Sequence, residues 1–86
     1  MTAMPLPATG GVTMFTTVWC GYCRRLKGQM EREGIEFREV DIEREPHHAD
    51  LVMSVNGGNR TVPTLLFADG SFATNPSIHQ VRDRLT

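Results

Sequence analysis

The sequence predicts an α/β fold, in which three helices cover a mixed four-stranded sheet in the order β-α-β-α-β-β-α. Short apolar runs typical of strands alternate with stretches whose apolar residues recur every three or four positions, as in helices. Glycines and prolines fall between these segments, where turns are expected. Right-handed β-α-β crossovers would then place helices on both faces of the sheet.

The first half of the chain predicts a strand, a helix and a second strand. The first strand covers residues 12–16, and the helix runs from about residue 20 to about residue 33. Residues 35–42 form the second strand. Its apolar residues change parity between Phe37 and Val40, so we expect a bend or an early strand end there.

The middle of the chain predicts a second helix and a deeply buried strand. Pro46 suits the first turn of a helix, where the missing N–H of proline costs nothing. The glycines at residues 57–58 end this helix. Its expected apolar face consists of Leu51, Val52 and Val55. Residues 64–67 are a short apolar run, which is typical of a strand buried on both faces.

The last part of the chain predicts a hairpin and a third helix. Residues 69–70 are Asp-Gly, a strong hairpin turn signal, and residues 71–74 are the returning strand. Asn75 is the expected cap of the third helix, with Pro76 at its first position. The expected apolar face of this helix consists of Ile78, Val81 and Leu85.

The composition excludes several classes of partner. A net charge of −1 with 22% charged residues gives no electrostatic reason to bind nucleic acid or an anionic membrane. No apolar run approaches the roughly 20 residues of a membrane span. We therefore expect neither nucleic acid nor a membrane as a partner, and we expect a monomer. The three histidines are expected on the surface.

The N-terminus and the cysteine count indicate the compartment. Residues 1–11 lack the basic start and the apolar region of a signal peptide, so they are expected to form a flexible tail before a single domain at residues 12–86. Two cysteines at C-x-x-C spacing do not make the disulfide framework of a secreted protein. A cytoplasmic redox protein is expected.

The most informative feature is the motif Trp19-Cys20-Gly21-Tyr22-Cys23, which holds both cysteines of the chain. A C-x-x-C between a strand and a helix is the arrangement that thiol–disulfide exchange needs. Unpaired N–H groups and the positive end of the dipole at a helix N-terminus favour a thiolate, which is the nucleophile. Cys20 is thus the expected attacking thiol, and Cys23 the more protected one.

A second motif, Thr61-Val62-Pro63, precedes the buried strand. Proline is unusual there because it cannot donate to the ladder, and a cis peptide bond is one reason to keep it. In this order of elements, the turn would lie beside Cys20. The backbone of Val62 would then offer its N–H and C=O to an incoming disulfide.

These motifs carry a resemblance to glutaredoxin-type proteins of the thioredoxin fold and, among them, to the mycoredoxins. The matching stretches are residues 19–23 with 25–27, residues 54–64, residues 68–71 and residues 74–76. The resemblance implies an oxidoreductase that reduces mixed disulfides between proteins and mycothiol, the cysteinyl pseudo-disaccharide that some bacteria use in place of glutathione. Mycothiol would be a co-substrate, with no tightly bound cofactor, and the partners would be mycothiolated or disulfide-bonded proteins.

Departures from ordinary glutaredoxins point the same way. Those proteins usually carry a lysine three residues before the first cysteine, where this chain has Thr17. Their Gly-Gly-x-Asp-type stretch corresponds here to residues 73–76. Mycothiol has hydroxyls and amides but no carboxylate, so the absence of the lysine cation suits mycothiol. Arg24 or Arg60 could replace the lysine. The expected substrate-binding residues are Trp19, Tyr22, Arg60, Thr61, Val62, Pro63, Thr74 and Asn75.

Three other interpretations of the cysteine pair remain open. Half of a zinc site would need two further ligands, and the adjacent His47 and His48 do not match the usual ligand spacing, so no metal is expected. A dithiol redoxin would use Cys20 and Cys23 together and be reduced by a flavoprotein. An iron–sulfur cluster carrier is also possible for glutaredoxins with glycine after the first cysteine, as at Gly21.

Overall fold

The computed structural model describes residues 6–7 and 10–85. Most of the predicted N-terminal tail, residues 1–5 and 8–9, lies outside the described residues, as does residue 86. The elements are β1 (Val12–Thr16), α1 (Gly21–Arg32), β2 (Phe37–Asp41), α2 (Pro46–Val55), β3 (Thr64–Phe67), β4 (Phe72–Thr74) and α3 (Ile78–Leu85). This order confirms the predicted β-α-β-α-β-β-α arrangement.

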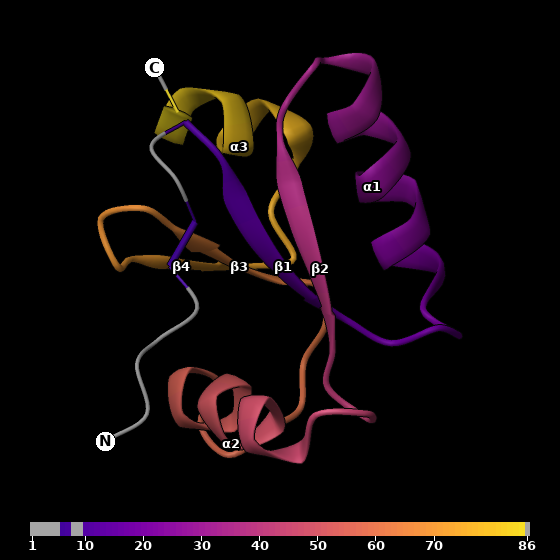
Figure 1. Ribbon diagram of the computed structural model, residues 1–86, viewed down its shortest axis with the longest axis vertical. Coiled ribbons are helices and arrows are strands. Elements are labelled where there is room, and N and C mark those ends of the chain that lie inside the picture. The colour runs from indigo at the N-terminus through magenta and orange to yellow at the C-terminus, as the bar shows by residue number, and fades with distance from the viewer. Residues whose placement is uncertain (1–5, 8–9, 86) are drawn as a thin grey trace.

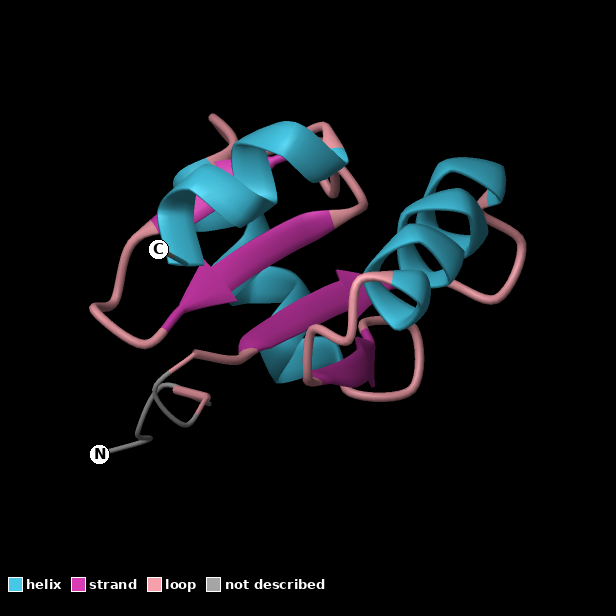
Figure 2. Ribbon diagram, turned by 90° about the horizontal axis from the view of Figure 1, so that it is seen from above, coloured by secondary structure: helices cyan, strands magenta, loops and turns pink. Residues whose placement is uncertain are grey.

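The four strands form one mixed sheet in the order β2-β1-β3-β4. Strand β1 is parallel to β2 and antiparallel to β3, and β3 is antiparallel to β4. Helices α1 and α3 cover one face of the sheet and α2 covers the other (Figures 1 and 2). The two central strands are therefore buried on both faces. Among the described residues, none of the helices is long and apolar enough to cross a membrane.

Two hydrophobic clusters fill the space on either side of the sheet. The cluster beneath α1 and α3 consists of Val12, Met14, Cys20, Cys23, Leu26, Met30, Leu65, Phe67 and Val81. The cluster beneath α2 consists of Phe15, Val40, Ile42, Ala49, Val52 and Leu66. Successive residues of β1 and β3 thus alternate between the clusters, because neighbouring side chains of a strand point to opposite faces.

The expected bend or early end of the second strand between Phe37 and Val40 is wrong. The parallel register with β1 continues without a break from Phe37, opposite Val12, to Asp41, opposite Thr16. Phe37 packs against the cluster beneath α1 and α3, whereas Val40 belongs to the cluster beneath α2. The change of parity therefore reflects a strand with an apolar layer on each face rather than a distortion.

The start of the third helix also differs from the prediction, since α3 begins at Ile78 and Asn75 does not cap it. The hydroxyl oxygen of Ser77 accepts the N–H of Gln80 at 3.2 Å, and the Gln80 side-chain oxygen accepts the N–H of Ser77 at 2.8 Å. This reciprocal pair is a capping box. Asn75 instead takes a left-handed conformation, with φ of 45°, which asparagine tolerates better than most residues.

Helix α2 begins at Pro46 as predicted, but its buried face lies one turn earlier than expected. His48, Ala49 and Val52 are buried, and Val55 is exposed. The expectation that all three histidines lie on the surface is therefore wrong for His48, which is 9% exposed. Its ring packs edge-on against Phe15 of β1, with centroids 5.9 Å apart.

Candidate active site

Cys20 occupies the N-cap position of α1, in an extended backbone conformation. Its Sγ accepts the N–H of Cys23 at 3.1 Å, which satisfies one of the N–H groups that a helix start leaves unpaired. The first turn of α1 contains no acidic residue that would oppose negative charge on the sulfur. Cys20 is only 5% exposed, so little of its surface is open to an incoming disulfide.

Cys23 lies one turn further into α1, in the cluster beneath α1 and α3, and is 2% exposed. Burial, as the largest cause, and the interaction with Cys20 together raise the pKa of its thiol from 9.0 to about 11. Hydrogen bonding with Thr16 and Thr17 opposes this shift. At neutral pH, Cys23 is therefore a protonated thiol. Both cysteines are in the free form.

The predicted turn before β3 lies beside Cys20. The peptide bond between Val62 and Pro63 is cis, as predicted, and the Val62 carbonyl oxygen lies 3.9 Å from Cys20 Sγ. The carbonyl oxygen of Pro63 accepts the N–H of Asn75 at 2.7 Å. The turn is thus held between Cys20 and the segment that leads to α3.

Asn56, a residue that sequence reasoning missed, ties this turn to its surroundings. Its side-chain amide nitrogen donates to the Val52 carbonyl at 2.9 Å and to the Thr64 hydroxyl at 3.1 Å, and its amide oxygen accepts from the Thr74 hydroxyl at 2.6 Å. The Thr64 hydroxyl in turn donates to the Thr61 carbonyl at 2.7 Å. One side chain therefore joins the end of α2 to β3, directly after the turn beside Cys20, and to the end of β4. No signal in the sequence distinguished Asn56 from Asn59.

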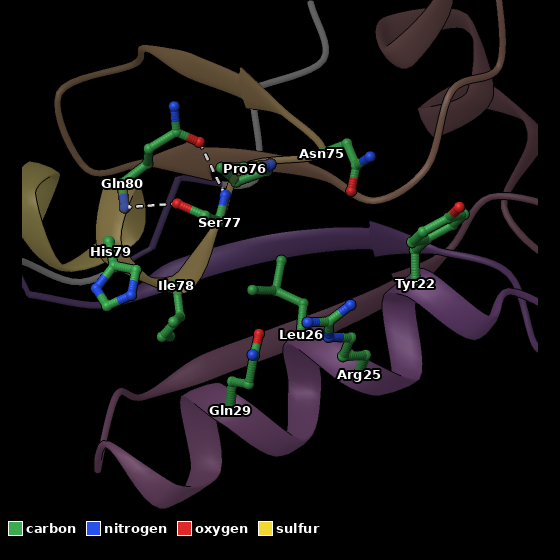
Figure 3. Close-up of a pocket in the computed structure, with 10 residues that line it drawn as sticks. All are labelled: Tyr22, Arg25, Leu26, Gln29, Asn75, Pro76, Ser77, Ile78, His79 and Gln80. Carbon is green, nitrogen blue, oxygen red and sulfur yellow. Dashed lines mark hydrogen bonds between the residues drawn. The ribbon is translucent and has the colours of Figure 1, made fainter.

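A cavity of about 440 Å³ lies between α1 and the segment before α3 (Figure 3). Tyr22 and Asn75 stand at one end of it (Figure 3). Tyr22 lies between the two cysteines in the chain, and the Asn75 N–H donates to the Pro63 carbonyl. Its remaining lining residues are Arg25, Leu26, Gln29, Pro76, Ser77, Ile78, His79 and Gln80. The polar lining is mainly amide and hydroxyl groups, and Arg25 is the one arginine or lysine among the described residues that line it.

Comparisons with known proteins agree with this geometry. The glutaredoxin family profile matches residues 12–73. The chain belongs to the glutaredoxin family. It is 54% identical, over 90% of its length and 92% of the relative's, to a Mycobacterium tuberculosis protein that carries a provisional glutaredoxin name. It is 41% identical to mycoredoxin 1 of Corynebacterium glutamicum, over 81% of this chain and 86% of that one. It is thus a mycoredoxin-like glutaredoxin and a thiol–disulfide oxidoreductase.

The fold agrees with solved structures as well. The glutaredoxin of Methanosarcina mazei superposes with a TM-score of 0.73, over 90% of this chain and 79% of that one, at 19% sequence identity. At that identity the likeness concerns the fold alone. It confirms the thioredoxin-type architecture that the sequence predicted for this glutaredoxin.

The remaining predicted substrate-binding residues of this glutaredoxin lie at different places around Cys20. Tyr22 and Trp19 are 67% and 66% exposed. The Trp19 indole donates to Glu43 Oε1 at 3.1 Å, so the ring is held toward the loop after β2. Arg60 is exposed, in the loop before the cis peptide bond. These three side chains are accessible, whereas Thr61 and Val62 of the turn are half-buried and Pro63 is buried.

Thr17, at the position where other glutaredoxins usually have lysine, is buried, and its hydroxyl has no hydrogen-bond partner. The nearby cations are engaged elsewhere: Arg24 donates to the Val18 carbonyl at 3.1 Å, and Lys27 forms a 2.7 Å ion pair with Glu39 of β2. Thr17 and Cys23 both line a second cavity of about 390 Å³, beside α1. The position of the usual lysine therefore presents no charge to a ligand at Cys20.

Proposed function

We propose that this glutaredoxin reduces mixed disulfides between mycothiol and proteins, with Cys20 as the nucleophile and a second mycothiol as the resolving thiol. The observation that carries the proposal is the difference between the two cysteines. Cys20 Sγ accepts a backbone N–H at the start of α1, whereas burial keeps the pKa of Cys23 near 11. A thiolate attacks a disulfide and a thiol does not.

The reaction has two exchange steps. The Cys20 thiolate attacks the mycothiol sulfur of the mixed disulfide, so a Cys20–mycothiol disulfide forms and the bond to the protein breaks. The protein sulfur leaves with the electron pair and takes a proton from solvent. A second mycothiol thiolate then attacks the mycothiol sulfur on Cys20, which forms oxidised mycothiol and restores the Cys20 thiolate. Each turnover therefore oxidises one free mycothiol, reduces the protein cysteine and releases oxidised mycothiol, half of which comes from the mixed disulfide.

Three features support mycothiol as the co-substrate. The first is the similarity to a relative named mycoredoxin 1. The second is the buried, neutral Thr17 at the position where a lysine would hold a glutathione carboxylate. The third is the cavity beside Tyr22 and Asn75, whose amide and hydroxyl groups suit the hydroxyls of a sugar. We infer that the protein works as a monomer in the cytoplasm, where both thiols stay reduced.

A reductase assay with one mixed-disulfide substrate tests the choice of reductant. Mycothiol, glutathione and a thioredoxin reductase with NADPH are compared as electron sources for the same enzyme preparation. We expect turnover with mycothiol, and little with the other two. Equal or faster turnover with glutathione contradicts the proposed specificity, and turnover with the flavoprotein alone supports a dithiol redoxin instead.

Cysteine variants test the mechanism in the same assay. Cys20→Ser abolishes turnover, because a neutral hydroxyl does not attack a disulfide at neutral pH. Cys23→Ser retains substantial mycothiol-dependent turnover, since the second nucleophile comes from solution, and it removes the Cys20–Cys23 disulfide as a competing state. An inactive Cys23→Ser variant, measured beside a fully active wild type, would contradict the monothiol mechanism. Cys20 would then be the nucleophile of a dithiol enzyme.

A further inference from the structure

A cluster of two imidazoles and a carboxylate lies at the start of α2, on the other face of the sheet from α1. Glu45, His47 and His48 each offer one ligand atom, and these atoms all lie within 4.8 Å of one another. Among residues 6–7 and 10–85, this is the single group of three such side chains close enough to share a cation, and neither cysteine belongs to it. The cluster has no role in the proposed disulfide exchange.

His48 distinguishes this cluster from a chance group of surface side chains. His48 is 9% exposed, and its Nδ1 is buried and has no hydrogen-bond partner. The nearest carboxylate oxygen, Glu45 Oε1, is 3.6 Å away, which is too long for a hydrogen bond. A buried polar atom left unpaired is costly, so the site favours a group that Nδ1 can bind.

The surroundings orient the ring toward such a group. Phe15 packs edge-on against the His48 ring from β1, which fixes it on the core side. The His47 ring lies 4.0 Å from the His48 ring, centroid to centroid. His47 is exposed and Glu45 is half-buried, so both can rotate about their side-chain bonds while His48 stays in place.

We propose that Glu45, His47 and His48 form a binding site for a divalent transition-metal ion, with Zn²⁺ as the best-suited physiological cation. Imidazole ligands suit zinc, copper and nickel, whereas magnesium and calcium need more oxygen ligands than this cluster has. Zinc bonds to histidine and carboxylate are about 2.0–2.2 Å long, so small rotations of the two accessible side chains bring the three atoms around one ion. Water would complete the coordination.

The electrostatic setting limits the affinity. The N-terminus of α2 carries the positive end of the helix dipole, and Arg44 precedes Glu45 in the chain. Both oppose a cation. With three protein ligands in a partly accessible place, we expect micromolar binding, weaker than the four-ligand sites that hold a fold together.

Zinc titration of the Cys20→Ser/Cys23→Ser double variant tests the site. This background is needed because thiolates bind zinc themselves. Competition with a chromogenic zinc chelator should show one micromolar site per chain. Adding His47→Ala or Glu45→Gln should weaken binding by at least about tenfold, the size of effect expected when a metal site loses supporting groups. His79→Ala, which removes a lone exposed histidine, is the matched control and should leave binding unchanged.

A second measurement separates loss of a ligand from loss of the fold. His48→Ala is avoided because the ring packs against Phe15. Thermal unfolding of the double variant should shift upward when ZnCl₂ is added, whereas with His47→Ala the unfolding temperature should not respond to zinc. Binding no tighter than millimolar, or an equal loss with His79→Ala and His47→Ala, overturns the proposal.

Discussion

Cys20 and Cys23 are three residues apart, yet their surroundings give them opposite chemical characters. Cys20 stands before the first turn of α1, where its sulfur receives a backbone N–H that has no other partner in the helix. Cys23 stands inside that turn and faces the apolar cluster beneath α1 and α3. Cys20 thus receives a hydrogen bond at the helix start, whereas burial raises the pKa of Cys23.

The raised pKa of Cys23 predicts a loss of stability at alkaline pH. Below pH 9 the thiol is protonated in both the folded and the unfolded chain, so it contributes no pH dependence. Between pH 9.0 and about 11 the unfolded chain loses this proton while the folded chain keeps it. Rising pH therefore favours unfolding, by roughly 2–3 kcal/mol over the whole window at about 1.4 kcal/mol per pKa unit.

Urea unfolding at several pH values checks this prediction, with Cys23→Ala as the comparison. Other groups also titrate in this range, so the quantity to follow is the difference in unfolding free energy between the wild type and the variant. The unfolding free energy of the wild type minus that of the variant should decrease as pH rises from 9 to 11. A constant difference would mean that the folded chain does not hold the Cys23 proton.

Residues that belong to a recognisable motif were predictable from the sequence, whereas residues whose role depends on tertiary packing were not. Cys20, Cys23 and the cis peptide before Pro63 follow from residue type and spacing, and the structure brings them together. The burial of His48 and the contacts of Asn56 depend on how α2 meets the sheet. Neither has a local signature, because a histidine or an asparagine has the same sequence neighbours whether it is exposed or buried.

At the scale of elements, the number, type and order of helices and strands were predictable, and some details of their ends and faces were not. Helix α3 could have been placed from Ser77 and Gln80, whose spacing is that of a capping box. The sequence predicts the cap at Asn75 instead, because Pro76 follows Asn75 and proline suits the first helical position. For β2, alternation predicts one buried face, so a strand with an apolar layer on both faces looks irregular in sequence.

Asn56 predicts a coupling between α2 and the turn beside Cys20. Asn56→Ala removes the bonds to the Val52 carbonyl and to the Thr64 and Thr74 hydroxyls, and we expect it to cost about 1–3 kcal/mol of unfolding free energy. Because the same bonds hold the residues next to the turn beside Cys20, the KM for mycothiol, the proposed co-substrate, should rise more than kcat falls. Steady-state kinetics with mycothiol, at a temperature where the variant is fully folded, measure both.

Asn59→Ala is the matched control for this prediction. Asn59 is exposed, and its side chain donates only to the Asn56 carbonyl, at 3.3 Å. Its removal should change neither stability nor KM appreciably. If Asn56→Ala lowered stability but left KM at the wild-type value, Asn56 would be a support of α2 alone rather than a positioning residue.

At the scale of the whole molecule, the sheet separates a layer formed by α1 and α3 from a layer formed by α2 (Figures 1 and 2). The layer of α1 and α3 holds Cys20, Cys23 and the cavity beside Tyr22, and an ion pair between Arg82 and Glu33, 3.4 Å long, joins the two helices. The layer of α2 holds the proposed metal site. Strands β1 and β3 contribute side chains to both layers, so neither layer has a core of its own.

This shared sheet predicts that the two layers unfold together. Val52 of α2 and Val81 of α3 are fully buried on opposite faces. Val52→Ala and Val81→Ala each remove two methyl groups, and each should cost about 2 kcal/mol from lost burial and the cavity left behind. Because the two valines belong to different clusters on opposite faces of the sheet, the double variant should lose the sum, within about 0.5 kcal/mol.

Urea unfolding, monitored by Trp19 fluorescence and by circular dichroism, tests whether the two layers unfold together. Trp19 reports on the layer of Cys20, and circular dichroism reports on all three helices. The two signals should give the same midpoint in the wild type and in both single variants, because loss of either layer exposes β1 and β3. A Val52→Ala variant in which the circular dichroism changes at lower urea than the fluorescence would show that α2 detaches alone, and that the Cys20 layer is stable without it.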